Sequence, residues 1–299
     1  LAVVRRAMKR YSPTAAKQRG MAIISALLIA AVVAVMAGAM LTRQSVFTRS
    51  LEAEQLRIQG QWLLQGGLER SQQLLWDARQ KDVLTRLDQP WARAQTGVFE
   101  GRLEDEQGKF NLRNLVNRQQ TDTEQLQSFE RLCRLIGVDP AVSRRISQRV
   151  IASYPQNGLP ARYPMLRSLD DLSGLEGLDP LMLQRMQRYI SVLPGQTWVN
   201  GNTASAEVLS AVVPQLNLAQ AHGLVAERDS GRWFINRGDF VNRLQLPQVA
   251  VDTVQVGITS EWFRLRGQAR REQRRVTIDA LLHRAEARQP QVIWSRVGV

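Results

Sequence analysis

The side chains that usually carry catalysis are scarce in this sequence. Only two of the 299 residues are histidines, His222 and His283, and only one is a cysteine, Cys133. No acid or cysteine constellation accompanies either histidine, and the chain has no G-x-S-x-G, P-loop or H-E-x-x-H motif. A single thiol forms no internal disulfide and no cysteine-based metal site. We therefore expect no enzyme activity and assign no catalytic residue.

A local group of carboxylates could provide metal chemistry. Asp170, Asp171, Glu176 and Asp179 lie close together in the sequence, and carboxylate oxygens are ligands for Ca²⁺. The segment lacks the D-x-[DN]-x-[DN]-G pattern of a calcium loop, however. Helix caps and a solvated face explain the same residues. The sequence therefore leaves the metal ligands unknown.

The N-terminus combines a basic leader with an apolar run. Residues 21–42 contain no Asp, Glu, Lys, Arg, His, Asn or Gln, and a helix of this length spans roughly 33 Å, enough to cross a bilayer. The leader has no acid and contains Arg5, Arg6, Lys9, Arg10, Lys17 and Arg19. This asymmetry places the N-terminus in the cytoplasm and the rest of the chain across the membrane. The segment is a leader cleaved after Gly20 before a retained helix, or an uncleaved signal anchor. A Sec-type signal peptide is a third option, but its apolar region is normally shorter and ends at an A-x-A-like site.

Composition supports a folded protein with a basic charge. The hydrophobic fraction is 44%, and the formal net charge is +13. Such a charge suits nucleic acid, a membrane surface or an acidic protein partner. Much of it belongs to the leader, where it sets membrane topology, and this weakens the nucleic-acid interpretation.

The apolar spacing predicts a long helix, followed by strands on both sides of a helical block. Leucines and tryptophans after Arg43 recur at steps of three and four, so the membrane helix is expected to continue beyond Arg43. The result is one helix of about 50 residues, half in the membrane and half packed on a folded domain, with a bend near its glycines. Alternating residues predict a strand at 98–105. The period of two returns near the C-terminus, at 263–267, 275–281 and 292–294, and predicts an antiparallel meander.

The predicted fold class is therefore α+β. A long N-terminal helix packs on a small antiparallel sheet, and an all-α subdomain is inserted between the strands. The predicted bounds are 1–20 for the leader, 21–42 for the transmembrane helix, 43–118 and 247–299 for the α+β domain, and 119–246 for the inserted helical domain.

The helical block contains an internal repeat. Leu-Ile-Gly-Val-Asp-Pro at 135–140 matches Leu-Glu-Gly-Leu-Asp-Pro at 175–180, a shift of 40 positions (175 − 135). Each glycine is expected to end one helix in a left-handed conformation, and each Asp-Pro pair to cap and begin the next. The residues of the two turns are Gly137, Asp139, Pro140, Gly177, Asp179 and Pro180. A further helix is predicted after residue 203, with Thr203 as its cap.

These turns resemble helix-hairpin-helix modules, which in many proteins bind nucleic-acid phosphate through backbone N–H groups. Here Asp139 and Asp179 follow the glycines by two positions. A carboxylate at that position occupies the helix N-terminus and repels phosphate. We favour a structural role and expect no nucleic-acid partner, with a membrane-anchored DNA-binding or uptake protein as the alternative.

Several motifs in a fixed order resemble those of one known family. They are the leader ending at Gly20 before an uncharged helix, Asp-Glu-Gln-Gly-Lys-Phe-Asn-Leu at 105–112, Leu-Arg-Ser-Leu-Asp-Asp-Leu at 166–172, Asn-Gly-Asn-Thr-Ala-Ser-Ala-Glu-Val-Leu at 200–209, and Val-Ile-Trp at 292–294. Together they resemble the type II secretion system minor pseudopilin K family, also called general secretion pathway protein K. The resemblance spans nearly the whole chain.

The resemblance implies a processing pathway. Prepilin peptidase would cleave after Gly20, and Met21 would be N-methylated. Pilin-like proteins usually carry Glu at the fifth mature position, which here is Ser25. That Glu is thought to pair with the N-terminal amine of the subunit above it, and a buried carboxylate without a partner is unfavourable. Ser25 therefore fits a subunit at the filament tip.

The same resemblance implies a function and partners. The protein would initiate assembly of the pseudopilus and cap it during export of folded proteins, and the inserted helices would block stacking of another subunit. Minor pseudopilins I and J would be direct partners, followed by H and the major pseudopilin G. The location would be the inner membrane, crossed once, with the globular part in the periplasm. Ca²⁺ is possible by the same resemblance, no other cofactor is expected, and a minor pilin of a type IV pilus is a further alternative.

Overall fold

The computed structural model describes residues 15–271 and 274–298 and divides the chain into two compact units, residues 1–59 and 60–299. Helix α1 (Ala15–Lys81) begins in the first unit and ends in the second. It has 67 residues and is longer than the helix of about 50 residues that the spacing predicted. The helix continues through Gly60, Gly66 and Gly67. No proline interrupts it, because the first proline after the apolar run is Pro90.

In the first unit, α1 exposes the apolar run of residues 21–42. An 18-residue window of the segment Met21–Lys81 has a mean hydropathy of 2.6, and no part of that window is buried. In the described part of the chain, this is the one helix that is long and apolar enough to cross a membrane. Exposure of this apolar surface to water would be unfavourable, and a bilayer core removes it from water.

The second unit contains a four-stranded antiparallel sheet in the order β1-β8-β9-β10. Its strands are β1 (Phe99–Asp105), β8 (Trp262–Arg271), β9 (Arg274–His283) and β10 (Gln291–Gly298). Strand β1 pairs with β8 along its whole length, although residues 106–261 lie between them. The predicted meander is confirmed, and β1 is added to it through β8.

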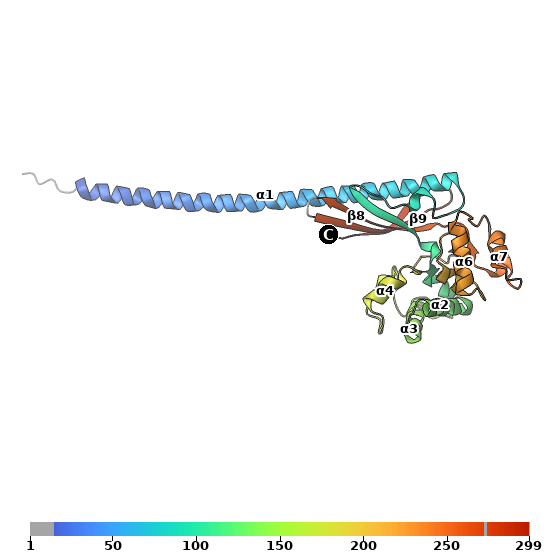
Figure 1. The fold of residues 1–299 in the computed structure, drawn as a ribbon. Helices are drawn as coiled ribbons and strands as arrows, with labels where there is room; N and C mark the ends of the chain where they lie inside the picture. Colours follow the sequence, from blue (N-terminus) through green and yellow to red (C-terminus); the bar gives the residue numbers. More distant parts are fainter. Residues whose placement is uncertain (1–14, 272–273, 299) are drawn as a thin grey trace, which may run out of the picture. The chain divides into compact units, whose positions relative to one another are not determined.

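The C-terminal part of α1, residues 60–81, covers one face of this sheet (Figure 1). Alternate strand residues point to that face, as the pleat requires. The shared core contains Leu64, Leu68, Leu75, Leu103, Phe263, Leu265, Ile278 and Leu282. The predicted α+β class, with a long helix packed on an antiparallel sheet, is confirmed.

Phe99 lies in a socket of glycines where this helix meets the sheet. Its ring contacts the backbone of Gly67 on α1, Gly101 on β1 and Gly267 on β8. A Cβ added to Gly67 would lie 2.5 Å from the ring, a distance that real Cβ atoms do not reach. The glycines therefore serve packing here, since they let helix and strands approach one aromatic side chain.

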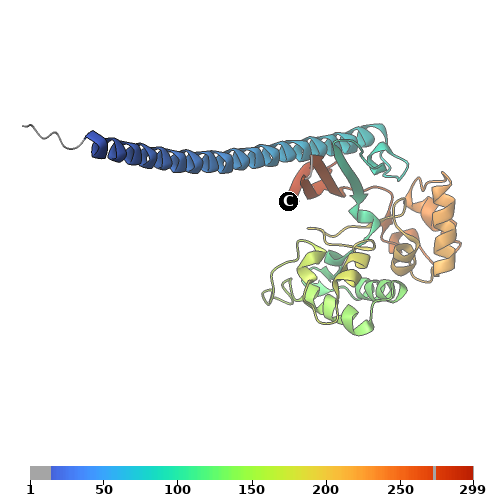
Figure 2. The same cartoon turned by 60° about the vertical axis from the view of Figure 1, so that its left-hand side comes forward.

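Residues 106–261, which we call the helical segment, form most of the rest of the second unit (Figure 2). Its α-helices are α2 (Thr123–Leu135), α3 (Pro140–Ile151), α4 (Pro180–Met186), α5 (Ala206–Val212), α6 (Leu218–Asp229) and α7 (Arg237–Leu244). The 3-10 turns of the chain are η1 (Pro90–Ala92), η2 (Glu106–Gly108), η3 (Leu112–Leu115), η4 (Leu169–Leu172) and η5 (Val251–Thr253). Two-residue strands are β2 (Phe110–Asn111), β3 (Val116–Asn117), β4 (Gln120–Thr121), β5 (Ile190–Ser191), β6 (Val199–Asn200) and β7 (Val256–Gly257). Residues 110–115, which follow the turn after β1, are thus mostly the 3-10 turn η3.

The helical segment has a hydrophobic core separate from that of the sheet. Its buried residues run from Phe110 to Val256 and include Phe129, Ile146 and Phe240. The core of the sheet is formed by α1, residues 91–103 and strands β8 and β9. The bounds of 119–246 for the inserted domain, and of 43–118 and 247–299 for the α+β domain, remain predictions.

Candidate functional site: a buried polar junction

A buried carboxylate marks the point where β1 leaves the sheet for the helical segment. Asp105 is the last residue of β1. Its Oδ2 accepts hydrogen bonds from Thr203 Oγ1 at 2.6 Å, Ser260 Oγ at 2.6 Å and Asn200 Nδ2 at 3.1 Å. Its Oδ1 accepts one from the backbone N–H of Gln107 at 2.9 Å. The Asp105 side chain thus connects the end of β1 with the middle of the helical segment and with the residues just before β8.

Two further residues extend this cluster to the chain that follows α1. Asn200 Nδ2 donates to the Thr85 carbonyl at 3.1 Å, and Ser260 N–H donates to Thr85 Oγ1 at 3.0 Å. Arg284, which follows β9, donates to Thr85 Oγ1 at 2.7 Å and to the Ser260 carbonyl at 2.8 Å. We call Thr85, Asp105, Asn200, Thr203, Ser260 and Arg284 the polar junction.

Burial shapes the electrostatics of the junction. It raises the pKa of the Asp105 carboxyl above its ordinary value, and the hydrogen bonds from Ser260, Thr203, Gln107 and Asn200 act in the opposite direction. Burial also lowers the pKa of Arg284 to about 10, while the charge of Asp105 opposes that change. The buried carboxylate and the buried guanidinium therefore depend on each other and on their hydrogen bonds, although Arg284 Nε makes none.

The turn that supplies Asn200 and Thr203 is itself held by buried side chains. Asn202 exchanges two hydrogen bonds with the backbone of Phe234, at 2.9 and 2.8 Å. Arg228, which is 3% exposed, donates to the carbonyls of Gly201 and Ala204. The junction therefore contacts a part of the helical segment that buried hydrogen bonds hold in place.

One predicted cap is wrong in this turn. Thr203 does not cap the helix that follows, because its hydroxyl binds Asp105. Ser205 is the N-cap of α5, and its side chain accepts from the N–H of Val208. Both residues lie in the same motif, and local propensity alone does not separate two hydroxyls two positions apart.

The two hairpin turns adopt similar local structures. Gly137 and Gly177 have positive φ values of 74° and 81°, and Pro140 and Pro180 begin α3 and α4. Asp139 Oδ1 accepts from Ala141 N–H at 2.7 Å, and Asp179 Oδ1 accepts from Met182 N–H at 2.8 Å. Both helix N-termini are thus capped by carboxylates, which disfavours phosphate at these turns.

The two histidines and the cysteine do not lie together in one site. His222 is exposed on α6, and His283 stacks on Trp262 with its Nε2 3.5 Å from a Glu261 oxygen. Cys133 is 1% exposed, and burial raises the pKa of its thiol to about 11. None of the three belongs to the polar junction.

Each acidic residue at 170–179 has its own partner within the protein. Asp170 pairs with Arg296, Glu176 pairs with Arg145, and Asp171 accepts from the N–H groups of Arg167 and Ser168. In the described residues, no group of three or more His, Cys, Asp or Glu side chains is placed to hold a metal ion. These carboxylates therefore do not fit a Ca²⁺ site, and we derive no step through a metal.

The processing site lies in the first unit. Gly20 and Met21 belong to α1, whereas residues 1–14 of the predicted leader lie outside the described residues. Ser25 donates its hydroxyl to the Met21 carbonyl at 2.8 Å, within the helix. Its hydroxyl thus needs no other partner. Leader cleavage and N-methylation stay predictions.

Comparisons with known proteins agree with the sequence motifs. Family models described as type II secretion system protein K match residues 108–195 and 199–259. Type II secretion system protein K of Pseudomonas aeruginosa is 27% identical to this chain in an alignment 314 positions long. The alignment covers 94% of this chain and 93% of that protein. The chain belongs to the type II secretion system protein K family.

A solved structure supports the fold of this protein K family member. A chain in the crystal structure of the GspK-GspI-GspJ complex from enterotoxigenic Escherichia coli matches with a TM-score of 0.64 and 17% identity, over 83% of this chain and 99% of that chain. The predicted pseudopilin fold is confirmed. As a member of the protein K family, the chain is a structural minor pseudopilin and not an enzyme, and its apolar N-terminal helix suits a membrane anchor.

Proposed function

We propose that this chain is the tip subunit of the type II secretion pseudopilus. It initiates assembly in the inner membrane and caps the filament while folded proteins are exported, with its globular part in the periplasm. Minor pseudopilins I and J bind it directly, and H and the major pseudopilin G follow. The relative in the Escherichia coli complex assembles with GspI and GspJ, which supports the first two partners.

The polar junction carries this proposal. Through Asn200 it attaches the helical segment to Thr85, four residues after the end of α1, and through Ser260 it attaches that segment to Asp105 at the end of β1. Subunits whose parallel helices begin in the membrane stack on the opposite, C-terminal side of those helices. A helical segment fixed there by buried hydrogen bonds cannot swing aside, so it excludes a further subunit.

Ser25 supports the same position in the filament. Its hydroxyl is satisfied by the Met21 carbonyl within its own helix. The usual Glu would instead require an amine from a subunit above it, and an unpaired carboxylate in the bilayer is unfavourable. In this proposal prepilin peptidase removes residues 1–20, and Met21 becomes the methylated N-terminus.

The position can be tested by imaging assembled pseudopili. The full chain carries an epitope at its C-terminus and is expressed with the other pseudopilins of its system, and sheared filaments are labelled with gold-conjugated antibody. We expect gold at one end of each filament. Gold along the filament length would overturn the tip assignment.

The partners and the processing need separate measurements. Full-length protein is co-expressed with I and J, extracted in detergent and purified through its tag, and we expect I and J to co-purify. Their absence, with all three proteins present in the membrane, would contradict direct binding. Mass spectrometry of the same sample should give an N-methylated Met21 start, and an intact leader in the presence of the peptidase would contradict processing.

A further inference from the structure

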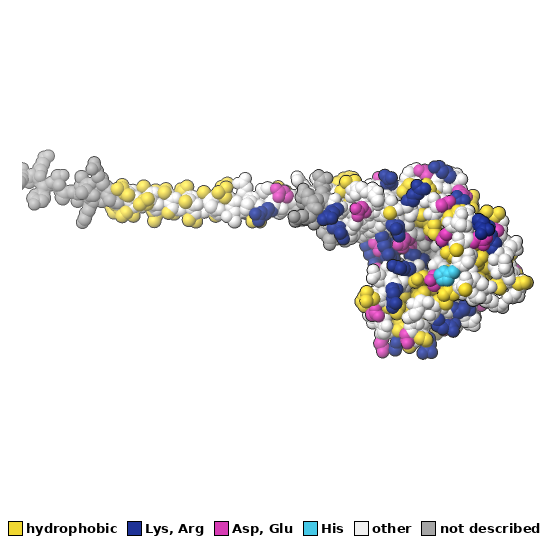
Figure 3. Space-filling model, in the orientation of Figure 1, with side chains coloured by type: hydrophobic (Ala, Val, Ile, Leu, Met, Phe, Trp, Pro, Cys, Tyr) yellow, Lys and Arg dark blue, Asp and Glu magenta, His cyan; other side chains and the backbone are white. Residues whose placement is uncertain are grey.

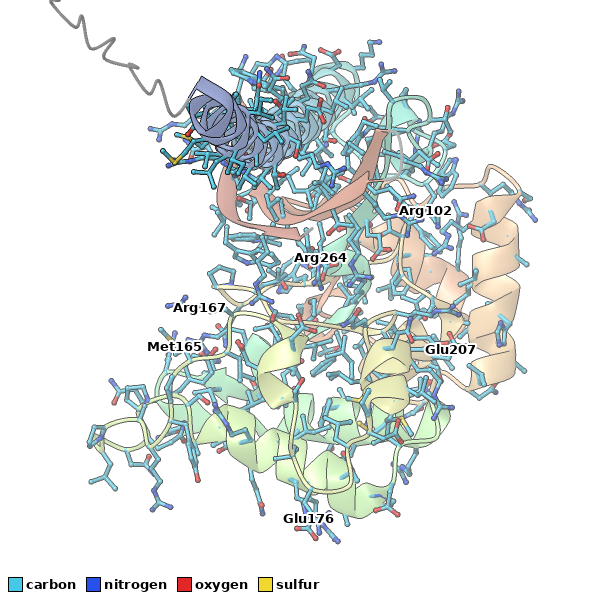
Figure 4. The ribbon with its side chains drawn as sticks, turned by 90° about the vertical axis from the view of Figure 1, so that its left-hand side faces the viewer. Arg102, Met165, Arg167, Glu176, Glu207 and Arg264 are labelled. Carbon is cyan, nitrogen blue, oxygen red and sulfur yellow. The ribbon has the colours of Figure 1, made fainter. Side chains whose placement is uncertain are left out.

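A cleft lies between the outer face of the sheet and the helical segment. Its volume is about 1410 Å³, and its walls come from β1, β8, α4 and the turn at 203–205. Lys and Arg side chains gather where these two parts meet (Figure 3). In Figure 4, Arg102 lies at the sheet and Glu207 on the helical segment at the same side of the molecule.

Four arginines line this cleft without a carboxylate partner. They are Arg102 on β1, Arg266 on β8, and Arg185 and Arg188 in and just after α4. None forms an ion pair with any residue that the structure describes. Arg264, on the same strand and face, shows the contrast, since Asp279 binds it with two hydrogen bonds.

The carboxylates in the walls are already occupied. Glu104 pairs with Lys109 at 3.0 Å, and Asp179 caps α4. Asp105 is buried in the polar junction and accepts four hydrogen bonds. No carboxylate in the walls pairs directly with these four arginines, although the charge of Arg266 acts on Glu104, so most of their positive charge is available to a ligand from solution.

The sheet register makes this arrangement unfavourable without a ligand. Arg102 lies directly opposite Arg266 in the β1–β8 ladder, and like charges at opposed positions destabilise a sheet. Arg266 is also oriented toward the helical segment, because its Nη2 donates to Gln187 Oε1 at 2.8 Å. An anion between the two guanidiniums would remove their repulsion.

We propose that this cleft binds an extended acidic peptide segment of a partner protein. Planar guanidiniums bind carboxylates through paired hydrogen bonds. Leu181, which is 73% exposed, and Leu87 offer apolar contacts to side chains between the acids. Glu104 and Asp179 interrupt the positive surface, which disfavours the continuous phosphates of a nucleic acid. The proposal holds whether or not the chain occupies the filament tip.

The test uses the full chain in detergent micelles and a defined probe. The probe is a short fluorescein-labelled peptide in which glutamate and leucine alternate, and binding is followed by fluorescence anisotropy at low salt. Arg102→Gln with Arg188→Gln removes two exposed charges from the cleft. Arg144→Gln with Arg288→Gln removes two exposed charges elsewhere and is the matched control.

We expect the cleft variant to weaken peptide binding about tenfold and the control to leave it unchanged, because two exposed charge-assisted contacts together contribute about that factor. A peptide with glutamine in place of glutamate should not bind. Equal losses in the two variants, or binding of the glutamine peptide, would overturn the proposal. Tighter, cleft-dependent binding of a single-stranded oligonucleotide would replace it with a nucleic-acid site.

Discussion

Replacement of Asp105 by alanine tests whether the polar junction holds the helical segment to the sheet. The variant removes the acceptor of four hydrogen bonds. Asn200 keeps its bond to the Thr85 carbonyl, and the Thr203 hydroxyl has a second acceptor in the Asn200 carbonyl at 3.4 Å. The Gln107 N–H and the Ser260 hydroxyl both lose their acceptor, and an unsatisfied buried donor costs about 1–3 kcal/mol.

Arg284 adds to this loss. Arg284 is 2% exposed, and the nearby charge of Asp105 favours its protonated form. Breaking a buried ion pair costs about 3–5 kcal/mol, and that figure is an upper limit here, because Arg284 and Asp105 interact through charge without a direct bond. Because Arg284 keeps its bonds to Thr85 and Ser260, we expect a total loss of about 3–5 kcal/mol in the free energy of unfolding rather than the sum of the two figures.

Urea unfolding of the full chain in detergent micelles measures this loss, followed through tryptophan fluorescence, since Trp91 is 1% exposed in the sheet core. Asp252→Ala is the control, because Asp252 is exposed and makes no side-chain hydrogen bond within the described part of the chain. The control should change stability by less than about 0.5 kcal/mol. A loss of under about 1 kcal/mol for Asp105→Ala would refute the structural importance of the junction.

Asp105 also sets a pH dependence whose sign follows from its pKa. The folded-state pKa is raised, so the folded protein binds the proton more readily than the unfolded chain. This contribution to stability is complete below the unfolded pKa and decreases as pH rises through the window up to the folded pKa. Over that window the wild type should lose stability relative to Asp105→Ala. A relative gain on raising the pH would contradict the direction.

Four further predictions concern the helical segment and use the same urea assay unless stated. Gly137→Ala, at φ 74° with open space around the added Cβ, should cost about 1–2 kcal/mol. Gly177→Ala should cost about 1 kcal/mol more, because the new methyl would lie 2.9 Å from Val142, and equal losses would contradict this. Ser205→Ala should lower the free energy of unfolding by about 1 kcal/mol, because α5 loses its N-cap. An unchanged stability would show that Ser205 is not the cap. Cys133, with a pKa of about 11, should resist iodoacetamide at neutral pH until urea unfolds the chain, and rapid labelling of the folded protein would refute its burial.

Local patterns in the sequence predicted the elements well. Alternation predicted the C-terminal meander, and the Gly-x-Asp-Pro spacing predicted turns in which Asp139 and Asp179 cap the following helices. Both signals arise between residues a few positions apart, so one sequence contains them. The end of α1 at Lys81 was harder to predict, because no proline or cap marks it.

The polar junction could not be predicted in the same way. Asp105 bonds to Asn200, 95 positions away, and to Ser260, 155 positions away. Each residue alone is typical of a turn, and the pairing follows only from the β1–β8 register. The cleft arginines are similar, since Arg102 and Arg266 become neighbours through that register. The motifs at 105–112 and 200–209 did contain three junction residues, and those residues were the available signal.

The glycine socket of Phe99 has a mechanical consequence. The Phe99 ring touches α1, β1 and β8 at glycines, which have no side chains. Rotation of the helix about its axis would replace Gly67 with a neighbouring residue, whose side chain would collide with the ring. Residues 60–81 and the sheet must therefore turn together, and the polar junction extends that coupling to the helical segment. A rotation imposed on the outer surface of this helix, where Trp62 is 72% exposed, would therefore also rotate residues 106–261.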